Sequence, residues 1–267
     1  MINVLIPTDF SKNSKNAIAY AIAFFKDTPC SFHLINVLDS NPEDTSNSEF
    51  LKRKSSLLKE QKKITDASKN NSHLAQSGIL YGDLIAAIKN EVNVRKINLI
   101  IMAAQGLPKN SGSTIGSKTT EVISKVKCNV IIVPKKASFR HVNQIAFVSD
   151  YSVYFGTQIL KTLSTIIEMF YSNIHIVHLI KSKDTIVQEQ VQNKEQLKDY
   201  FIEEKHQFYT LLNKNPKAEI QKFIEKHQIK LLAIMAKNVH LYQQLIFQNN
   251  KTNLEYQSTT PLLILHE

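Results

Sequence analysis

The sequence predicts an α/β protein of two tandem domains, each an open sheet of about five parallel strands flanked by helices. Short apolar runs alternate along the chain with segments whose apolar residues recur at helical spacing. This alternation begins again after residue 140. The length of 267 residues suits two domains of ordinary size.

The first half of the chain contains the elements of one such domain. Expected strands are Ile2–Thr8, Ser31–Val37, Gln76–Leu80, Asn98–Ala103 and Asn129–Val133. Expected helices are an apolar-striped segment from Ala17 to Phe25, a basic segment over 50–70, Leu84–Val94, and one ending near Lys127. Right-handed crossovers should place helices on both faces of a parallel sheet.

Four segments of the second half repeat segments of the first half in the same order. Val4–Ser11 (VLIPTDFS) corresponds to Ile145–Ser152 (IAFVSDYS). The other pairs are Ser31–Val37 with Asn173–Leu179, Leu84–Ala103 with Ala218–Ala236 (LIIMA with LAIMA), and Cys128–Val133 with Thr260–Leu265. The offset stays between 132 and 142 residues, which indicates two copies of one unit. We expect domains at 1–138 and 139–267, joined within Pro134–Arg140.

Charge and cysteine content exclude some classes of protein. The net charge is +10, of which +9 falls in residues 1–140. A basic half can attract phosphates or nucleic acid, but the lysines between Lys52 and Lys63 share one helical stretch and fit a solvated helix face. Cys30 and Cys128 form no CxxC pair, so we expect two buried thiols rather than a disulfide framework or a cysteine metal site.

The ends and the hydropathy of the chain favour a soluble, cytoplasmic protein. The apolar run Val4–Ile6 starts at once, lacks the basic segment of a signal peptide and ends at Pro7. No apolar stretch approaches the ~18–20 residues that span a bilayer.

The segment after Ala103 has the composition of an anion-binding loop. Gly106 and Gly116 permit close approach of backbone to a ligand, and Gly116-Ser117 opens a helix whose free N–H groups favour an anion. Lys118 adds a positive charge in the first turn; Ser117 and Thr119 add hydroxyls. In open parallel sheets, ligands bind at carboxyl ends of strands where the strand order reverses, and Asp9 and Ala103 follow or end such strands.

Two common phosphate motifs do not fit this loop. Gly112–Thr119 has too short a gap for a Walker A sequence, and Ser117 separates the glycine from Lys118. The dinucleotide fingerprint GxGxxG is absent as well.

The loop resembles the nucleotide loop of universal stress proteins, G-x2-G-x9-G-[ST], at Ala103, Gly106, Gly116 and Ser117. Further segments resemble that family in the correct order: Val4–Ser11, Leu34–Val37, Tyr81-Gly82-Asp83 and Lys127–Val130, although proline is usual where Asn129 stands. The resemblance covers nearly the whole chain as a tandem pair.

The resemblance implies five parallel strands per domain and, as in some members, an ATP site. It places Thr8 and Asp9 near the ribose and base and Val37 beside the adenine. The full expected nucleotide site is Pro7, Thr8, Asp9, Val37, Met102, Ala103, Gly106, Gly116, Ser117, Lys118 and Thr119. Ala103 stands where the ATP-binding pattern has glycine, so its methyl group either crowds the phosphate path or tightens it. No metal-ligand set is expected beyond a Mg²⁺ ion that accompanies the nucleotide.

The second copy has lost the loop. Counting back from Pro261 puts Gln248-Asn249 where the first copy has Gly116-Ser117, and Val239 where it has Gly106. No glycine follows Gly156. We expect a structural role here: an internal pseudo-dimer with the first copy through strands near 130–133 and 262–265, as family dimers pair, with room for a further homodimer.

Histidines of the second copy are interpreted as structural. His175 and His178 lie three apart on a predicted strand and so face opposite sides, which is poor geometry for one metal. His178 falls where the first copy has Asn36. A packed, solvated helix is expected from about Asp184 to His206.

These features favour a non-catalytic stress-response regulator whose first domain binds ATP or a related adenine nucleotide. Binding would bias the loop Gln105–Ser117 and change how a protein partner docks. No residue is an evident base or nucleophile, so we expect no enzyme. The alternative is a nucleotide-free scaffold or interaction module, which Ala103 and the decay of the second copy favour. Nucleic-acid binding is disfavoured because no aromatic–basic interleaving occurs.

Overall fold

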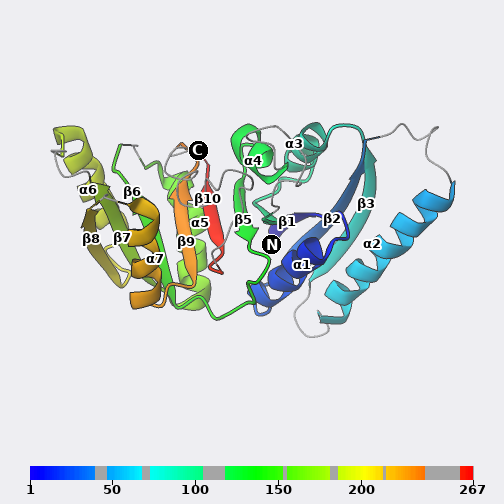
Figure 1. Ribbon diagram of the computed structural model, residues 1–267, viewed down its shortest axis with the longest axis horizontal. Coiled ribbons are helices and arrows are strands. Elements are labelled where there is room, and N and C mark those ends of the chain that lie inside the picture. The colour runs from blue at the N-terminus through cyan, green and yellow to red at the C-terminus, as the bar shows by residue number, and fades with distance from the viewer. Residues whose placement is uncertain are drawn as a thin grey trace. The chain divides into compact units, whose positions relative to one another are not determined.

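The computed structural model divides the chain into two compact units, Met1–Phe139 and Arg140–Glu267 (Figure 1). It describes residues 1–39, 47–67, 73–104, 118–152, 155–180, 186–212, 215–237 and 259–266. Each unit is an open parallel sheet with helices packed on it, so the predicted fold class is confirmed.

Unit 1 is a doubly wound domain. Its elements are β1 (Ile2–Pro7), α1 (Lys12–Phe24), β2 (Cys30–Leu38), α2 (Asn47–Ala67), β3 (Leu74–Tyr81), α3 (Leu84–Val94), β4 (Leu99–Ala103), α4 (Lys118–Lys125) and β5 (Asn129–Val133). The strands pair in parallel in the order β3-β2-β1-β4-β5, which reverses between β1 and β4. Helix α1 contacts α2, and α3 contacts α4, because the reversal sends the later crossovers to the opposite face.

Unit 2 repeats this topology. Its elements are β6 (Gln144–Ser149), α5 (Thr157–Phe170), β7 (Asn173–Ile180), α6 (Gln188–Tyr200), β8 (His206–Leu212), α7 (Pro216–Lys226), β9 (Leu231–Met235) and β10 (Leu262–Leu265). The strands are parallel in the equivalent order β8-β7-β6-β9-β10. Two tandem units of five parallel strands each are therefore present.

The central strands are buried along their whole length. Every residue of β4 and of β9 is buried, and Val4, Leu5 and Ile6 of β1 have no exposed surface. Helices cover both faces of a doubly wound sheet, which explains why these strands are continuous apolar runs rather than alternating ones. Cys30 and Cys128 are buried as expected, and burial raises the pKa of each thiol to about 12.

The structure changes one alignment within the repeat. Val4 pairs with Leu99 in unit 1, and its counterpart Ile145 pairs with Leu231 in unit 2. The offset at β4 and β9 is therefore 132 residues, so LIIMA (99–103) matches LLAIM (231–235) and not LAIMA. The two strands are both apolar throughout, so composition alone did not fix the register.

The helix expected from Asp184 to His206 is shorter in the structure. Helix α6 ends at Tyr200, and a turn follows in which the Glu204 N–H donates to the Phe201 carbonyl at 2.9 Å. Phe201, the C-cap residue, is fully buried. His206 instead begins β8, an edge strand with the partial exposure that its apolar–polar alternation indicates.

The two units differ at one matched group of side chains near the end of their third helices. Arg95 and His227 are the C-cap residues of α3 and α7. In unit 1, Arg95 pairs with buried Glu91 at 2.5 Å and donates to Gln76 at 2.8 Å. In unit 2, His227 stacks on Phe223 with ring centroids 4.2 Å apart. An ion pair has thus been replaced by an aromatic stack.

His175 of unit 2 packs into the same aromatic group. Its ring lies 5.1 Å from that of His227 and 5.5 Å from that of Tyr209. Its Nε2 lies 2.7 Å from the Gln144 side-chain oxygen. Burial, and then the nearby His227, lower the pKa of His175; burial, and then Lys226, lower the pKa of His227.

We predict that unit 2 loses stability in mild acid through these two histidines. Their pKa values are depressed in the folded state, so the unfolded chain takes up protons first as the pH falls through the ordinary histidine pKa of about 6.5. The free energy of unfolding is therefore full above that pH and declines below it. The change His227→Phe should leave stability at pH 7.5 nearly unchanged and make the decline toward pH 5 shallower, as measured by urea denaturation. Identical pH dependence in the variant and the wild type would contradict this assignment.

Candidate functional site

A cleft opens in unit 1 at the carboxyl ends of β1, β2 and β4, where the strand order reverses. This is the position at which open α/β sheets bind ligands. Its lining includes seven of the expected site residues: Pro7, Thr8, Asp9, Val37, Met102, Ala103 and Lys118. Segments separated by almost the whole length of unit 1 are thereby brought together.

The remaining expected residues divide into two groups. Gly106, Gly116 and Ser117 lie outside the described residues. Thr119 is buried, and its Oγ1 donates to the Ala103 carbonyl oxygen at 3.1 Å. Thr119 therefore ties the first turn of α4 to the end of β4, and Lys118 beside it lines the cleft.

Four lining residues were absent from the sequence-based set: Ser14, Ile35, Asn36 and Leu84. Ser14 lies one turn into α1, where a hydroxyl gives no signal apart from its spacing from Asp9. Leu84 follows the Tyr81-Gly82-Asp83 turn that the sequence had singled out. Gly82 has φ 97°, which favours glycine, and Asp83 caps α3 by accepting the Ala86 N–H at 2.8 Å.

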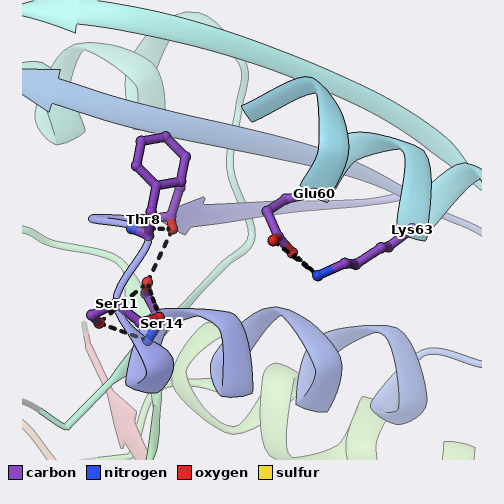
Figure 2. A network of polar contacts seen from close by, with 6 residues as sticks. Thr8, Ser11, Ser14, Glu60 and Lys63 are labelled. Carbon is purple, nitrogen blue, oxygen red and sulfur yellow. Dashed lines mark hydrogen bonds and ion pairs between the residues drawn. The ribbon is translucent and has the colours of Figure 1, made fainter. Parts of the chain in front are cut away.

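Buried hydroxyl groups fix the turn between β1 and α1 (Figure 2). Thr8 Oγ1 donates to Ser14 Oγ at 3.1 Å and accepts the Phe10 N–H at 3.1 Å. Ser14 Oγ donates to the Ser11 carbonyl at 3.1 Å, and the Ser11 hydroxyl caps α1 by accepting the Ser14 N–H at 3.2 Å. This network holds Phe10 at φ 62°, a conformation that a bulky side chain rarely adopts.

Asp9 presents an ionised carboxylate to the cleft. Burial raises the pKa of Asp9, but hydrogen bonds from Ser11 and Ser14 together lower it by more, and the net pKa is below the usual value. One carboxylate oxygen accepts the Ser11 N–H at 3.0 Å. The side chain is exposed at the rim, so it can accept further hydrogen bonds from a ligand.

Asn36 joins the cleft to α2. Its Nδ2 donates to the Thr8 carbonyl at 2.7 Å, and its Oδ1 accepts a hydrogen bond from Arg53 at 3.2 Å. Arg53 also pairs with Glu49 at 2.8 Å on the same helix. Asn36 is buried, so both its amide groups are satisfied within the protein.

Unit 2 has different side chains at the positions that match Phe10 and Asn36. His178 replaces Asn36; the Ser149 carbonyl can only accept, so His178 Nδ1 donates to it at 3.0 Å. The Tyr151 ring stacks on His178 with centroids 4.5 Å apart and 13° between planes. Tyr151 is 2% exposed, whereas its counterpart Phe10 is only half-buried.

Helix α6 is hydrogen-bonded to the turn that follows β6. Gln190 donates to the Asp150 carbonyl at 2.7 Å, and Asn193 donates to the Tyr151 carbonyl at 2.8 Å. The backbone of this turn is thus bound by side chains of unit 2 itself. Val239 and Gln248-Asn249, where the sequence indicates loss of the loop, lie outside the described residues.

The described ranges also bear on metal sites and on membrane spans. Within those ranges, no three or more His, Cys, Asp or Glu side chains gather closely enough to hold a metal ion. No helix within them is both long and apolar enough to cross a membrane.

The fold is that of an open, doubly wound α/β protein with a cleft at the reversal of strand order in unit 1. The model of the universal stress protein family matches residues 1–134, half of the chain. The chain therefore belongs to the universal stress protein family. No relative among curated proteins matches it.

Solved structures share the fold over both units. A universal stress protein from Archaeoglobus fulgidus DSM 4304 aligns with a TM-score of 0.73 and 16% identity, covering 99% of this chain and 96% of that chain. A protein of unknown function from Pseudomonas aeruginosa PAO1 aligns with a TM-score of 0.56 and 12% identity, covering 98% of this chain and 92% of that chain. At these identities the likeness extends to the fold alone.

We predict that Asn36 is required for the stability of unit 1. The change Asn36→Leu leaves the buried Thr8 carbonyl without its donor, which should cost about 1–3 kcal/mol in the free energy of unfolding. Asn36→His introduces the residue that unit 2 has at this position. It should lower the free energy of unfolding by less, because an imidazole N–H can replace the amide donor. Urea denaturation at neutral pH measures both. Equal losses in the two variants would show that the hydrogen bond to Thr8 is not what matters.

Proposed function

We propose that unit 1 binds ATP or a related adenine nucleotide in the cleft at the ends of β1, β2 and β4. One observation carries the proposal: seven residues chosen for a nucleotide site from the sequence line a single cleft at the strand-order reversal. The cleft combines the apolar Val37 with the carboxylate of Asp9 and the ammonium group of Lys118. This mixture suits a flat base, a ribose diol and a phosphate chain.

The proposed roles follow from position on the sheet. Val37, at the end of β2, packs against the adenine. Asp9 and Thr8 accept hydrogen bonds from the ribose or base. Lys118 and the first turn of α4 neutralise phosphate charge, together with Gly106, Gly116 and Ser117 of the loop.

Ala103 is the residue that sets how tightly phosphates can approach. It is 5% exposed at the end of β4, and its carbonyl is held by Thr119. Its methyl group therefore cannot move away from a ligand without disturbing the start of α4. We propose that it weakens nucleotide binding relative to glycine rather than abolishing it. A Mg²⁺ ion would be held through the phosphates and water.

Unit 2 is proposed to be a degenerate copy without a nucleotide site. The burial of Tyr151 against His178, and the hydrogen bond from Asn193 of α6 to the Tyr151 carbonyl, support this, because the residue that replaces Asn36 is engaged in contacts within unit 2. Its role would be to pair with unit 1 as an internal pseudo-dimer.

The protein as a whole is proposed to be a cytoplasmic regulator that binds nucleotide without turning it over. Nucleotide in the cleft would bias the Gln105–Ser117 loop and change the docking of a protein partner. Among described cleft residues, the one carboxylate, Asp9, has a lowered pKa and is a poor base. A nucleotide-free scaffold is the second candidate; Ala103 and the loss of the glycines from the sequence of the second copy favour it.

Paired aspartates test the assignment of the site to unit 1. The change Asp9→Ala should weaken ATP binding by at least about tenfold, because a charged acceptor is lost. Asp150→Ala alters the matching aspartate of unit 2 and should leave the affinity unchanged. Isothermal titration calorimetry of both variants provides the comparison. Equal affinities in both variants would place the nucleotide elsewhere, and no heat with the wild type would favour the scaffold.

Small-to-large changes test the phosphate end of the cleft. Ala103→Val and Gly116→Val should each abolish measurable ATP heat, because a branched side chain fills the phosphate path. Ala103→Gly should bind more tightly than the wild type. Heats unchanged in either valine variant would rule out the proposed phosphate position.

A further inference from the structure

Helix α2 presents an outer face that neither the fold nor the cleft uses. It is the longest described helix, with 21 residues, and lies along the edge strand β3 of unit 1 (Figure 1). Two apolar side chains of the helix itself, Leu57 and Ile64, are buried. Gln61 donates to the Ala75 carbonyl at 2.8 Å and accepts from Ser77 at 2.6 Å, which fixes the rotation of the helix on the strand.

Two leucines lie at the centre of the outer face. Leu51 is 55% exposed and Leu58 is 52% exposed. They are seven residues apart, so at 3.6 residues per turn they are aligned along the helix. Ser55 and Lys62 continue the same line. Exposed leucines in a heptad line form half of a seam between two helices.

Lysines border this seam on both sides. By helical geometry Lys54 lies on one side, and Lys52 and Lys59 lie on the other. All four of Lys52, Lys54, Lys59 and Lys62 are exposed, and none forms an ion pair with a described residue. Two other cations of the helix are already paired: Arg53 with Glu49, and Lys63 with buried Glu60 (Figure 2). The outer face is therefore a line of leucines bordered by lysines that form no ion pair within the described part of the chain, although Lys54 lies 6.0 Å from the centre of the Phe50 ring.

The equivalent helix of unit 2 lacks this face. Helix α6 has 13 residues, and its charged side chains are three acids and two lysines. Unit 2 has the same topology with a shorter helix, so the fold requires neither the length of α2 nor its basic, leucine-bearing surface. This difference separates the surface from the architecture common to both units.

We propose that the outer face of α2 is a docking surface for an acidic amphipathic helix of a partner protein. Leucines of the partner would pack against Leu51 and Leu58, and its carboxylates would pair with the flanking lysines. A helix that lies in a membrane interface presents a broad apolar face, whereas the exposed apolar surface of α2 is a single line of two leucines. Most contacts of a helix with nucleic acid are polar contacts to phosphate and sugar, so exposed leucines at the centre of its basic face would contribute little. The proposal does not depend on nucleotide binding.

A synthetic peptide tests the surface in the full-length protein. The probe is a labelled helix of about three heptads with leucine at the two seam positions and glutamate beside them; a scrambled peptide of the same composition is the reference. Fluorescence anisotropy should show tighter binding of the ordered peptide, weakening with salt. Binding of neither peptide, or equal binding of both, would overturn the proposal.

Matched variants assign the binding to residues. Leu51→Ser with Leu58→Ser should weaken it at least about tenfold, and Lys52→Glu with Lys59→Glu should do the same. The controls are Ile202→Ser with Leu212→Ser, which are 67% and 53% exposed in unit 2, and Lys161→Glu with Lys205→Glu. Loss of affinity in the controls to the same degree would refute a site on α2. The folded state of each variant is verified by its urea midpoint.

Two other polyanions test whether the lysines of this face bind nucleic acid or a membrane instead of a protein helix. Transfer RNA and vesicles containing anionic lipid are titrated against the same variants. Tight binding of either that needs the lysines and ignores the leucines would reassign the face to a nucleic acid or a membrane, and would overturn the protein-helix proposal.

Discussion

Parallel strand pairing with a reversal of order is the constraint on which the site of unit 1 depends. Because β1 lies between β2 and β4, the crossover helices that follow β2 and β4 pack on opposite faces of the sheet. No crossover covers the carboxyl ends at that point, so a cleft forms there. Hydrogen bonding of the sheet therefore brings together Asp9, Val37 and Ala103, which are distant in the sequence.

The same constraint acts in unit 2 with a different result. Both units leave their first strand through an aromatic residue with positive φ, Phe10 at 62° and Tyr151 at 58°. Both hold this turn with a strand-end hydroxyl and a donor from the next strand, Asn36 or His178. The position of the aromatic ring differs. Tyr151 stacks on His178 and is buried, whereas Asn36 has no ring on which Phe10 could stack. One substitution on the second strand thus accompanies the burial of the aromatic ring that follows the first strand.

The sequence was sufficient for those features that local patterns determine. Continuous apolar runs identified nearly every buried strand, and the helix predicted over Leu84–Val94 has those bounds in the structure. It was insufficient where tertiary contacts decide: the end of α6 depends on the burial of Phe201, and the register of β9 depends on pairing with β6. Ser14 and Asn36 line the cleft only because the turn brings them there. Thr119, chosen for its hydroxyl, uses that hydroxyl on the Ala103 carbonyl.

Helix α2 connects the cleft with the proposed docking face by a single side chain. Arg53 reaches from the inner side of the helix to Asn36, whose other end holds the Thr8 carbonyl. Physical adjacency alone does not couple two sites, because coupling needs an element with two arrangements that each ligand favours differently. Helix α2 is fixed along β3 by Gln61 and by buried Leu57 and Ile64, which argues for one arrangement along most of its length. In its first turns, which contain the ion pair of Arg53 with Glu49, no side chain from Ser48 to Ser56 is buried. Any influence of nucleotide on a partner at this face would therefore act through Leu51 and its neighbours before it reached Leu58.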